Sequence, residues 1–108
     1  MSGSIDIERL RDSVRRGRIQ WQRHSLEKMV KRGILREEIK KVLLDGIRIE
    51  DYPGDYPLPS ALFFGKPDKR PLHAVAAFDE KSETVFVITA YEPDLDHFED
   101  DLSTRRKK

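Results

Sequence analysis

Histidines are the side chains of this 108-residue sequence that are best suited to move protons near neutral pH. His24 directly precedes a helical pattern, where the positive end of the helix dipole favours the neutral imidazole of a general base. His73 lies in an apolar, strand-like segment, and His97 lies in an acidic stretch that favours a solvated side chain. His24 and His73 are therefore the candidate catalytic histidines. The competing interpretations are a helix cap or surface residue for His24 and a half-buried structural residue for His73.

Tyr91 becomes a partner for His73 if the two strands that carry them pair in a suitable register. When paired residue numbers have an even sum near 164, the two side chains stand opposite each other on one face of the hairpin. An odd sum places them on opposite faces. Thr89 shares the face of Tyr91, because it precedes Tyr91 by two residues on the same strand. The alternative for Tyr91 is an aromatic side chain that only packs at the edge of the sheet.

Basic side chains cluster beside His24. Lys28 and Arg32 lie four residues apart on one side of the predicted helix. Arg23 and Lys31 complete this basic cluster. Cleavage of RNA by its 2′-hydroxyl needs a base for the 2′ proton, an acid for the leaving 5′ oxygen and fixed cations beside the phosphate. The cluster supplies such cations, which also hold nucleic-acid phosphates, although a solvated helix face without a partner would look the same.

The apolar pattern predicts the elements that would position these residues. Apolar residues recur at helical spacing in three stretches, each followed by a glycine, at 7–14, 26–30 and 35–43. Alternating or continuous apolar residues then predict four strands, at 47–50, 61–64, 72–78 and 85–91. The connections are too short for parallel crossovers, so successive strands should be antiparallel. The sequence therefore predicts an α+β fold in which N-terminal helices cover one face of a four-stranded antiparallel sheet.

Composition limits the classes of function. The length suits one domain, which we expect to span residues 1–98 and to be followed by a charged, frayed tail at 99–108. Cysteine is absent and no metal-binding motif occurs, so we expect no metal and no cofactor. The net charge of +1 conceals a charge of +6 over residues 1–48 and −5 over the remainder. The N-terminus lacks a signal peptide and no segment resembles a membrane span, so we expect a cytoplasmic protein that does not bind membranes.

Several short motifs occur together between positions 19 and 98. They are His24-Ser25-x-x-Lys28-Met29-x-x-Arg32-Gly33-Ile34, Glu38, Val42-Leu43, Gly46, Ile49-Glu50-x-Tyr52-Pro53, Pro59-Ser60, Pro71-Leu72-His73-Ala74-Val75 and Val87-Ile88-Thr89-Ala90-Tyr91-x-Pro93-Asp94. This combination resembles a bacterial family known as domain of unknown function 4258 (DUF4258). Leu35 departs from the family, which tends to carry serine or threonine there as the cap of the third helix.

The family resembles the RelE-like and BrnT-like toxins, which are small α+β ribonucleases encoded beside an antitoxin. The resemblance implies a RelE-like (BECR) fold, RNA cleavage without a metal, and neutralisation by a small antitoxin protein that wraps the basic face. We therefore expect a metal-independent endoribonuclease of a toxin–antitoxin module. Its expected catalytic residues are His24, His73, Tyr91 and Arg32. Its expected substrate-binding residues are Lys28, Arg23, Lys31, Thr89 and Glu50.

Two other functions stay open at this point. A non-catalytic binding module would hold a protein or a small ligand with its sheet and the proline-containing loop at 51–59. In such a module the polar motif residues would be buried, hydrogen-bonded supports. The third possibility is a metal protein that uses histidine ligands.

Overall fold

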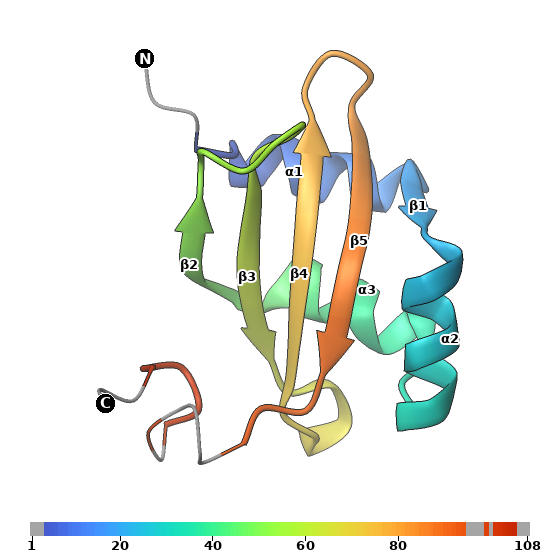
Figure 1. Ribbon diagram of the computed structural model, residues 1–108, viewed down its shortest axis with the longest axis vertical. Coiled ribbons are helices and arrows are strands. Elements are labelled where there is room, and N and C mark those ends of the chain that lie inside the picture. The colour runs from blue at the N-terminus through green and yellow to red at the C-terminus, as the bar shows by residue number, and fades with distance from the viewer. Residues whose placement is uncertain (1–3, 95–98, 100, 106–108) are drawn as a thin grey trace.

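The computed structural model describes residues 4–94, 99 and 101–105, and its described part is a mixed α+β fold (Figure 1). In chain order the elements are α1 (Ile7–Arg15), β1 (Ile19–Trp21), α2 (Arg23–Arg32), α3 (Arg36–Asp45), β2 (Ile47–Tyr52), β3 (Ser60–Gly65), the 3₁₀-helix η1 (Pro67–Lys69), β4 (Leu72–Asp79) and β5 (Thr84–Tyr91). The predicted α+β class is confirmed. None of the described helices has the length and apolar character needed to cross a bilayer. His97, for which a solvated position was predicted, lies outside the described residues, as do parts of the predicted tail.

The helix ends follow from local chemistry. Asp6 caps α1, because its carboxylate accepts hydrogen bonds from two backbone N–H groups of the first turn. Gly33 ends α2 in the left-handed conformation, at φ +67°. Leu35 has no oxygen with which to cap α3, but its backbone N–H donates to the Glu38 carboxylate at 2.9 Å. The departure at Leu35 therefore leaves the start of α3 in place.

The start of α2 differs from the prediction, which placed His24 immediately before this helix. α2 starts at Arg23, so His24 is its second residue. Gln22 keeps the extended backbone of the preceding strand, with φ −68° and ψ 141°, and the chain turns from there directly into the helix. His24 is thus a surface residue of the first turn.

The sheet has five strands in the order β1-β5-β4-β3-β2, and the prediction of four strands was wrong. The additional strand is β1, which runs parallel to β5, with Ile19 beside Val85 and Trp21 beside Val87. Three residues are too few to show an alternating pattern, and β1 pairs only with β5, which is the last strand along the chain. The other three pairings are antiparallel, as predicted.

The helices cover one face of the sheet and leave the other face open. α1 and α3 lie behind the strands in Figure 1, and α2 stands beside the edge formed by β1 and β5. The largest fully buried apolar side chains of the core include those of Leu10, Ile39, Leu43, Phe63 and Phe78. Burial of each such side chain stabilises the fold by about 1.5–3 kcal/mol relative to its exposure. This core fixes the sheet on which the polar residues of the open face are arranged.

Candidate functional site

A bulge in β5 decides which side chains share the open face. Close to the hairpin turn, β4 and β5 pair in an odd register, for example Ala76 with Val87. One extra residue of β5, Ile88, then shifts the register, and His73 pairs with Tyr91. Without the extra residue the odd register would continue, and Tyr91 would lie on the face opposite to His73. The even register, which the sequence left open beside the odd one, therefore holds where His73 pairs with Tyr91, and it depends on this bulge.

Ser25 on the inner side of α2 holds the bulge. Its buried hydroxyl lies 2.6 Å from the carbonyl oxygen of Ile88 and 3.1 Å from that of Val87. Bulges disrupt the regular ladder locally, and buried carbonyl groups there need another donor. The Ser25 hydroxyl is that donor. The residue next to His24 in the sequence motif therefore sets the geometry of β5.

His73 and Tyr91 lie at the centre of the polar groups on the open face. The His73 imidazole is fully buried, and its Nδ1 lies 3.4 Å from the Tyr91 hydroxyl oxygen. Its Nε2 lies 2.7 Å from the backbone carbonyl oxygen of Leu102. Because a carbonyl oxygen can only accept a hydrogen bond, Nε2 carries the proton and donates. In the neutral ring Nδ1 is then the acceptor that faces Tyr91. Phe64 packs edge-on against the imidazole, with ring centroids 5.5 Å apart.

Glu50 and Thr89 occupy the adjacent row of side chains on the same face. Glu50 pairs with Leu62 across β2 and β3, and Leu62 continues in register through Val75 to Thr89. Paired residues share a face, so this row runs beside the row that holds His73 and Tyr91. The structure thus gathers Glu50, Thr89, His73 and Tyr91 on one face of the sheet.

Glu50 is held by two neighbours. Its Oε1 accepts a hydrogen bond from the Tyr52 hydroxyl. Its two carboxylate oxygens also accept from the guanidinium of Arg105, with Nε to Oε2 and Nη2 to Oε1 both at 2.9 Å. We call the group of Glu50, Tyr52, His73, Tyr91 and Arg105 the His73 cluster.

The environment fixes the protonation of the cluster. Burial lowers the pKa of His73, and burial raises the pKa of Tyr91. Hydrogen bonds from Arg105 lower the pKa of Glu50, whereas burial and the bond to Glu50 raise the pKa of Tyr52 to about 12. At neutral pH the cluster therefore contains a neutral imidazole, two protonated phenols, a carboxylate and the guanidinium of Arg105. This combination can accept and donate protons at adjacent positions.

Arg32 lies on the other side of Tyr91. Its Nη1 donates to the backbone carbonyl of Ala90 at 2.7 Å, which fastens the end of α2 to β5. Arg32 and Tyr91 line one cavity of about 430 Å³, together with Glu92 and Asp94. The predicted catalytic residue Arg32 is thus beside the site, and it also supports the strand that carries Tyr91.

Arg70, between η1 and β4, is a structural residue. Its Nη1 and Nη2 donate to the backbone carbonyls of Gly33 at 2.7 Å and Arg32 at 2.9 Å. Its Nε donates to the Glu92 carboxylate at 2.5 Å. Arg70 therefore ties the C-terminal end of α2 to the segment after β5 and pairs with one of the carboxylates of the cavity.

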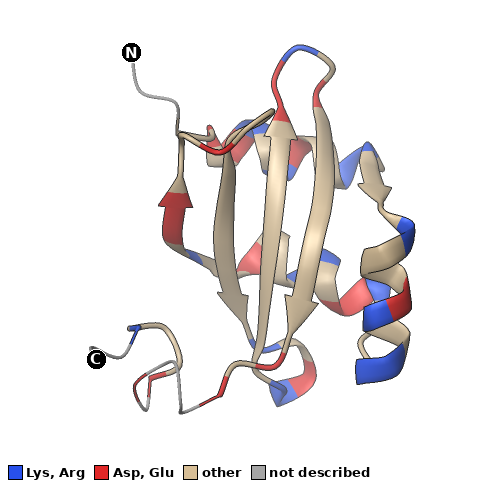
Figure 2. Cartoon of the chain, viewed as in Figure 1, with Lys and Arg blue, Asp and Glu red and all other residues tan. Residues whose placement is uncertain are grey.

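His24 and the basic residues of α2 form a separate surface. His24, Lys28 and Lys31 are exposed, and the side chain of Arg23 is 93% exposed beside Glu27. Figure 2 shows Lys and Arg along α2 at the side of the sheet. The structure brings His73 and Tyr91 into contact and places Arg32 beside Tyr91, whereas His24 lies on the helix surface.

Sequence reasoning gave Arg105 no role and considered Tyr52 only as part of a possible partner-binding surface in the proline-containing loop. Tyr52 was placed in the loop, because the predicted strand ended at Glu50, but β2 continues to Tyr52. The alternation that puts Glu50 and Tyr52 on one face was a usable signal. No sequence pattern connects Arg105 to Glu50, since the contact bridges 55 residues and starts in a charged terminal segment.

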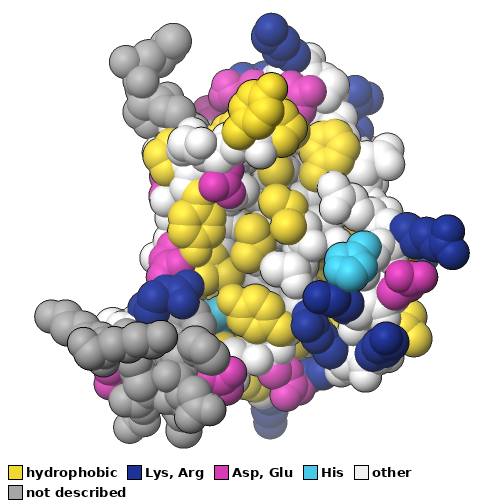
Figure 3. Space-filling model, viewed as in Figure 1, with side chains coloured by type: hydrophobic (Ala, Val, Ile, Leu, Met, Phe, Trp, Pro, Cys, Tyr) yellow, Lys and Arg dark blue, Asp and Glu magenta, His cyan; other side chains and the backbone are white. Residues whose placement is uncertain are grey.

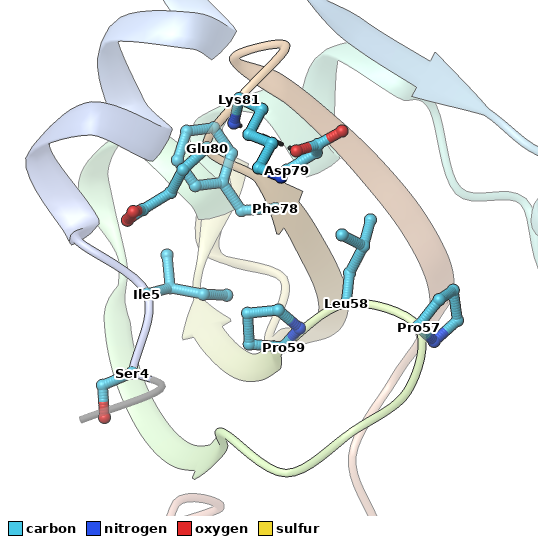
Figure 4. A pocket seen from close by; sticks show the side chains of 9 residues that line it. All are labelled: Ser4, Ile5, Pro57, Leu58, Pro59, Phe78, Asp79, Glu80 and Lys81. Atoms are coloured by element: carbon cyan, nitrogen blue, oxygen red, sulfur yellow. Dashed lines mark hydrogen bonds between the residues drawn. The ribbon is translucent and has the colours of Figure 1, made fainter. Parts of the chain in front are cut away.

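A second region, at the opposite end of the sheet, has a larger cavity of about 530 Å³ (Figure 4). Ile5, Leu58 and Phe78 give it apolar walls, and Asp79 and Lys81 lie at its rim. Its described lining contains no histidine or tyrosine. Within the described part of the chain, no group of three or more His, Cys, Asp or Glu side chains is arranged to hold a metal ion. The His73 cluster is therefore the candidate site for proton-transfer chemistry.

Comparisons with known proteins identify the family. Neither the curated proteins nor the solved structures gave a match. The family model described as "Domain of unknown function (DUF4258)" matches residues 21–92, which is more than half of the chain. The matched part runs from the end of β1 past the end of β5, so it includes Ser25, Glu50, His73 and Tyr91. The chain therefore belongs to the DUF4258 family, as its motifs indicated.

Proposed function

We propose that the chain is a metal-independent endoribonuclease, related to the RelE-like and BrnT-like toxins, whose active site is the His73 cluster. The observation that carries this proposal is the contact of the His73 Nδ1 acceptor with the Tyr91 hydroxyl, beside the Glu50 carboxylate. Internal transesterification of RNA needs a neutral base that takes the 2′ proton and a protonated acid that serves the leaving 5′ oxygen. The protonation of His73 and Tyr91 supports these two roles.

The proposed reaction is internal transesterification. The His73 Nδ1 takes the proton of the 2′-hydroxyl, and the 2′-oxygen attacks the phosphorus. The bond from phosphorus to the 5′-oxygen breaks, and Tyr91 donates its proton to the leaving oxygen. The products are a 2′,3′-cyclic phosphate and a 5′-hydroxyl, and proton exchange with water restores both side chains. Arg32, in the cavity beside Tyr91, offsets negative charge that develops on the phosphate.

The exposed cations of α2 fit a binding role in this proposal. Arg23, Lys28 and Lys31 lie on the helix surface, where they can contact phosphates that flank the cleavage site. The same surface suits an acidic antitoxin that competes with RNA. His24 shares this surface and takes no part in proton transfer.

The test of this proposal is the chemistry of cleavage. Labelled RNA is incubated with the protein in excess EDTA, beside the same sequence with every 2′-hydroxyl replaced by hydrogen. We expect the RNA to be cut and to carry 2′,3′-cyclic phosphate ends, because the nucleophile is the 2′-oxygen. The deoxy strand should stay intact. Cutting of the deoxy strand, or cleavage that EDTA abolishes, would contradict the proposal.

A non-catalytic binding module is the second candidate, and the apolar part of the open face favours it. Hydrophobic side chains gather over the strands on this face (Figure 3). Leu58, Phe86 and Ile88 line a cavity of about 300 Å³ there, and Tyr56, which also lines it, is 94% exposed. Exposed apolar surface of this kind is typical of binding sites. A folded protein that binds an apolar fluorescent dye through this cavity, with loss of binding in Ile88→Asp and no RNA cleavage, would support this candidate.

A further inference from the structure

The Glu50 carboxylate already holds a planar pair of N–H donors. The two bonds from Arg105 have the same length, 2.9 Å, and each uses a different carboxylate oxygen. This is the bidentate geometry in which two parallel N–H groups meet a carboxylate in one plane. The Arg105 side chain is 51% exposed and the Glu50 side chain only 23% exposed. The acceptor is therefore part of the sheet surface, and the donor approaches it from outside.

The two carboxylate oxygens of Glu50, which we call the Glu50 fork, are held in their orientation by contacts other than those with Arg105. Glu50 lies on β2, where the pairing with β3 fixes its backbone, and the Tyr52 hydroxyl donates to its Oε1. Both supports belong to the sheet. The carboxylate would thus keep its orientation if Arg105 moved away, and another pair of donors could bind in its place.

The segment that carries Arg105 covers the cluster as a unit. The Asp101 carboxylate accepts hydrogen bonds at 2.9 Å from the backbone N–H groups of Ser103 and Thr104, which closes a compact turn. Leu102 within this turn has φ +58°, and its carbonyl accepts the bond from His73 Nε2. The turn therefore occupies His73 and the Glu50 fork together.

We propose that the Glu50 fork is a base-recognition subsite that selects guanine in RNA, and that Arg105 fills it in the ligand-free protein. Guanine is the one RNA base whose Watson–Crick edge presents two adjacent N–H donors, at N1 and N2. Adenine and cytosine present one amino donor beside an acceptor, and uracil presents one N–H between two carbonyls. Single-stranded RNA is commonly read on this edge. The inference rests on the proposed function, since guanine reaches Glu50 as part of an RNA whose phosphate lies near His73.

The competition between Arg105 and guanine predicts how affinity responds to substitution. Arg105 is tethered to the site, so it acts at a high effective concentration and lowers the apparent affinity for guanine. Removal of its guanidinium should therefore strengthen guanine binding. A bidentate contact to a base typically gives roughly 5- to 150-fold discrimination against the wrong base.

The experiment measures binding of 3′-GMP, 3′-IMP and 3′-AMP to the full-length protein by calorimetry. Arg105→Ala should bind 3′-GMP about tenfold more tightly than the wild type does, and about tenfold more tightly than it binds 3′-AMP. 3′-IMP, which lacks the N2 amino group, should bind with intermediate affinity. The double variant Glu50→Gln with Arg105→Ala should lose the preference for 3′-GMP. Arg16→Ala is the matched control, because Arg16 also forms exposed ion pairs and should leave all three affinities unchanged.

Three results would overturn the subsite. They are equal affinities for the three nucleotides, weaker 3′-GMP binding in Arg105→Ala, and binding of N-acetylarginine amide to that variant in preference to 3′-GMP. The last result would identify a receptor for arginine side chains. Thermal unfolding of each variant establishes that it is folded. Guanine preference without RNA cleavage would support the subsite and contradict the proposed nuclease activity. His73-dependent cleavage without base preference would support the nuclease activity and contradict the subsite.

Discussion

The His73 cluster and the exposed surface of α2 differ in the property that catalysis needs most, which is fixed geometry. In the cluster, His73 is fully buried and both ring nitrogens have partners. On α2, His24 and Lys28 are exposed, and the Arg23 side chain is almost fully exposed. Proton transfer requires groups that are held in place before the reaction, whereas phosphate binding tolerates mobile cations. The contrast favours the open face for the proposed chemistry and α2 for the proposed attachment of RNA.

The inner side of α2 contributes in a different way from its outer side. Ser25 holds the bulge that turns Tyr91 toward His73, and Arg32 binds the carbonyl of Ala90. One helix therefore positions the cluster through its contacts with β5, while His24, Lys28 and Lys31 face solvent. Substitutions on the two sides should consequently have different effects, and the following predictions use that contrast.

Tyr91→Phe should have the largest effect of these substitutions on the rate. It removes the hydroxyl that faces His73 but keeps the ring, so kcat for RNA cleavage should fall about 100-fold with little change in stability. Tyr56→Phe is the control, because Tyr56 is exposed and lines the cavity of about 300 Å³, whose described lining includes no residue of the cluster. Steady-state cleavage of a labelled RNA measures both variants. Equal rates for Tyr91→Phe and wild type would remove Tyr91 from the mechanism.

Ser25→Ala should affect both the stability and the site. The free energy of unfolding should decrease by about 1–3 kcal/mol, since the carbonyl groups of Val87 and Ile88 lose the hydroxyl that they share as a donor. Cleavage should decrease as well, because the bulge no longer fixes the position of Tyr91. Urea denaturation measures the first effect, with Ser82→Ala in the exposed hairpin as the control. An unchanged unfolding midpoint in Ser25→Ala would show that the bulge does not depend on Ser25.

The pH dependence of stability should report on the burial of His73. Burial lowers the pKa of His73 below its ordinary value of 6.5, so the unfolded chain binds a proton at pH values where the folded protein does not. The stabilisation from neutral His73 is complete above pH 6.5 and is lost as the pH falls through the lowered pKa. The urea midpoint of the wild type should therefore decrease more steeply below pH 6.5 than that of His73→Gln. Parallel curves for the two proteins would contradict the burial of a neutral imidazole.

Substitutions on the outer side of α2 should have the smallest effects. Lys28→Ala and Lys31→Ala should each raise KM by about two- to threefold at low salt and leave kcat unchanged, because each removes one phosphate contact. The slope of the logarithm of the binding constant against the logarithm of the salt concentration should decrease in magnitude by about 1 per substitution, as expected for the loss of one phosphate contact. Fluorescence anisotropy with labelled RNA at several salt concentrations measures this slope. A large decrease in kcat would instead place these lysines in the chemical step.

The sequence was sufficient for most of the fold because the helices and the long strands have regular apolar periods. β4 and β5 were identified from continuous apolar runs, and the hairpin between them fixed their antiparallel pairing. β1 was missed, since three residues carry no period and the strand pairs in parallel with the last one. Regular patterns are local, and the position of β1 results from long-range packing.

The site was predictable only where it depends on a regular local pattern. The pairing of His73 with Tyr91 followed from strand alternation, but whether its register was even or odd depended on the bulge at Ile88. His24 was grouped with them because it is a histidine beside cations, and the helix surface on which it lies became evident only in three dimensions. The contact between Glu50 and Arg105 joins the second strand to the terminal segment, and no short-range pattern encodes it.

The most direct test of the account compares the two histidines. Purified wild type, His73→Gln and His24→Gln are incubated with a labelled structured RNA in excess EDTA, after circular dichroism has established that each is folded. We expect cleavage by the wild type, a loss of about 100-fold or more in His73→Gln, and a rate within about twofold of the wild type in His24→Gln. Loss of cleavage in His24→Gln with retention in His73→Gln would contradict the account and would move the active site to α2.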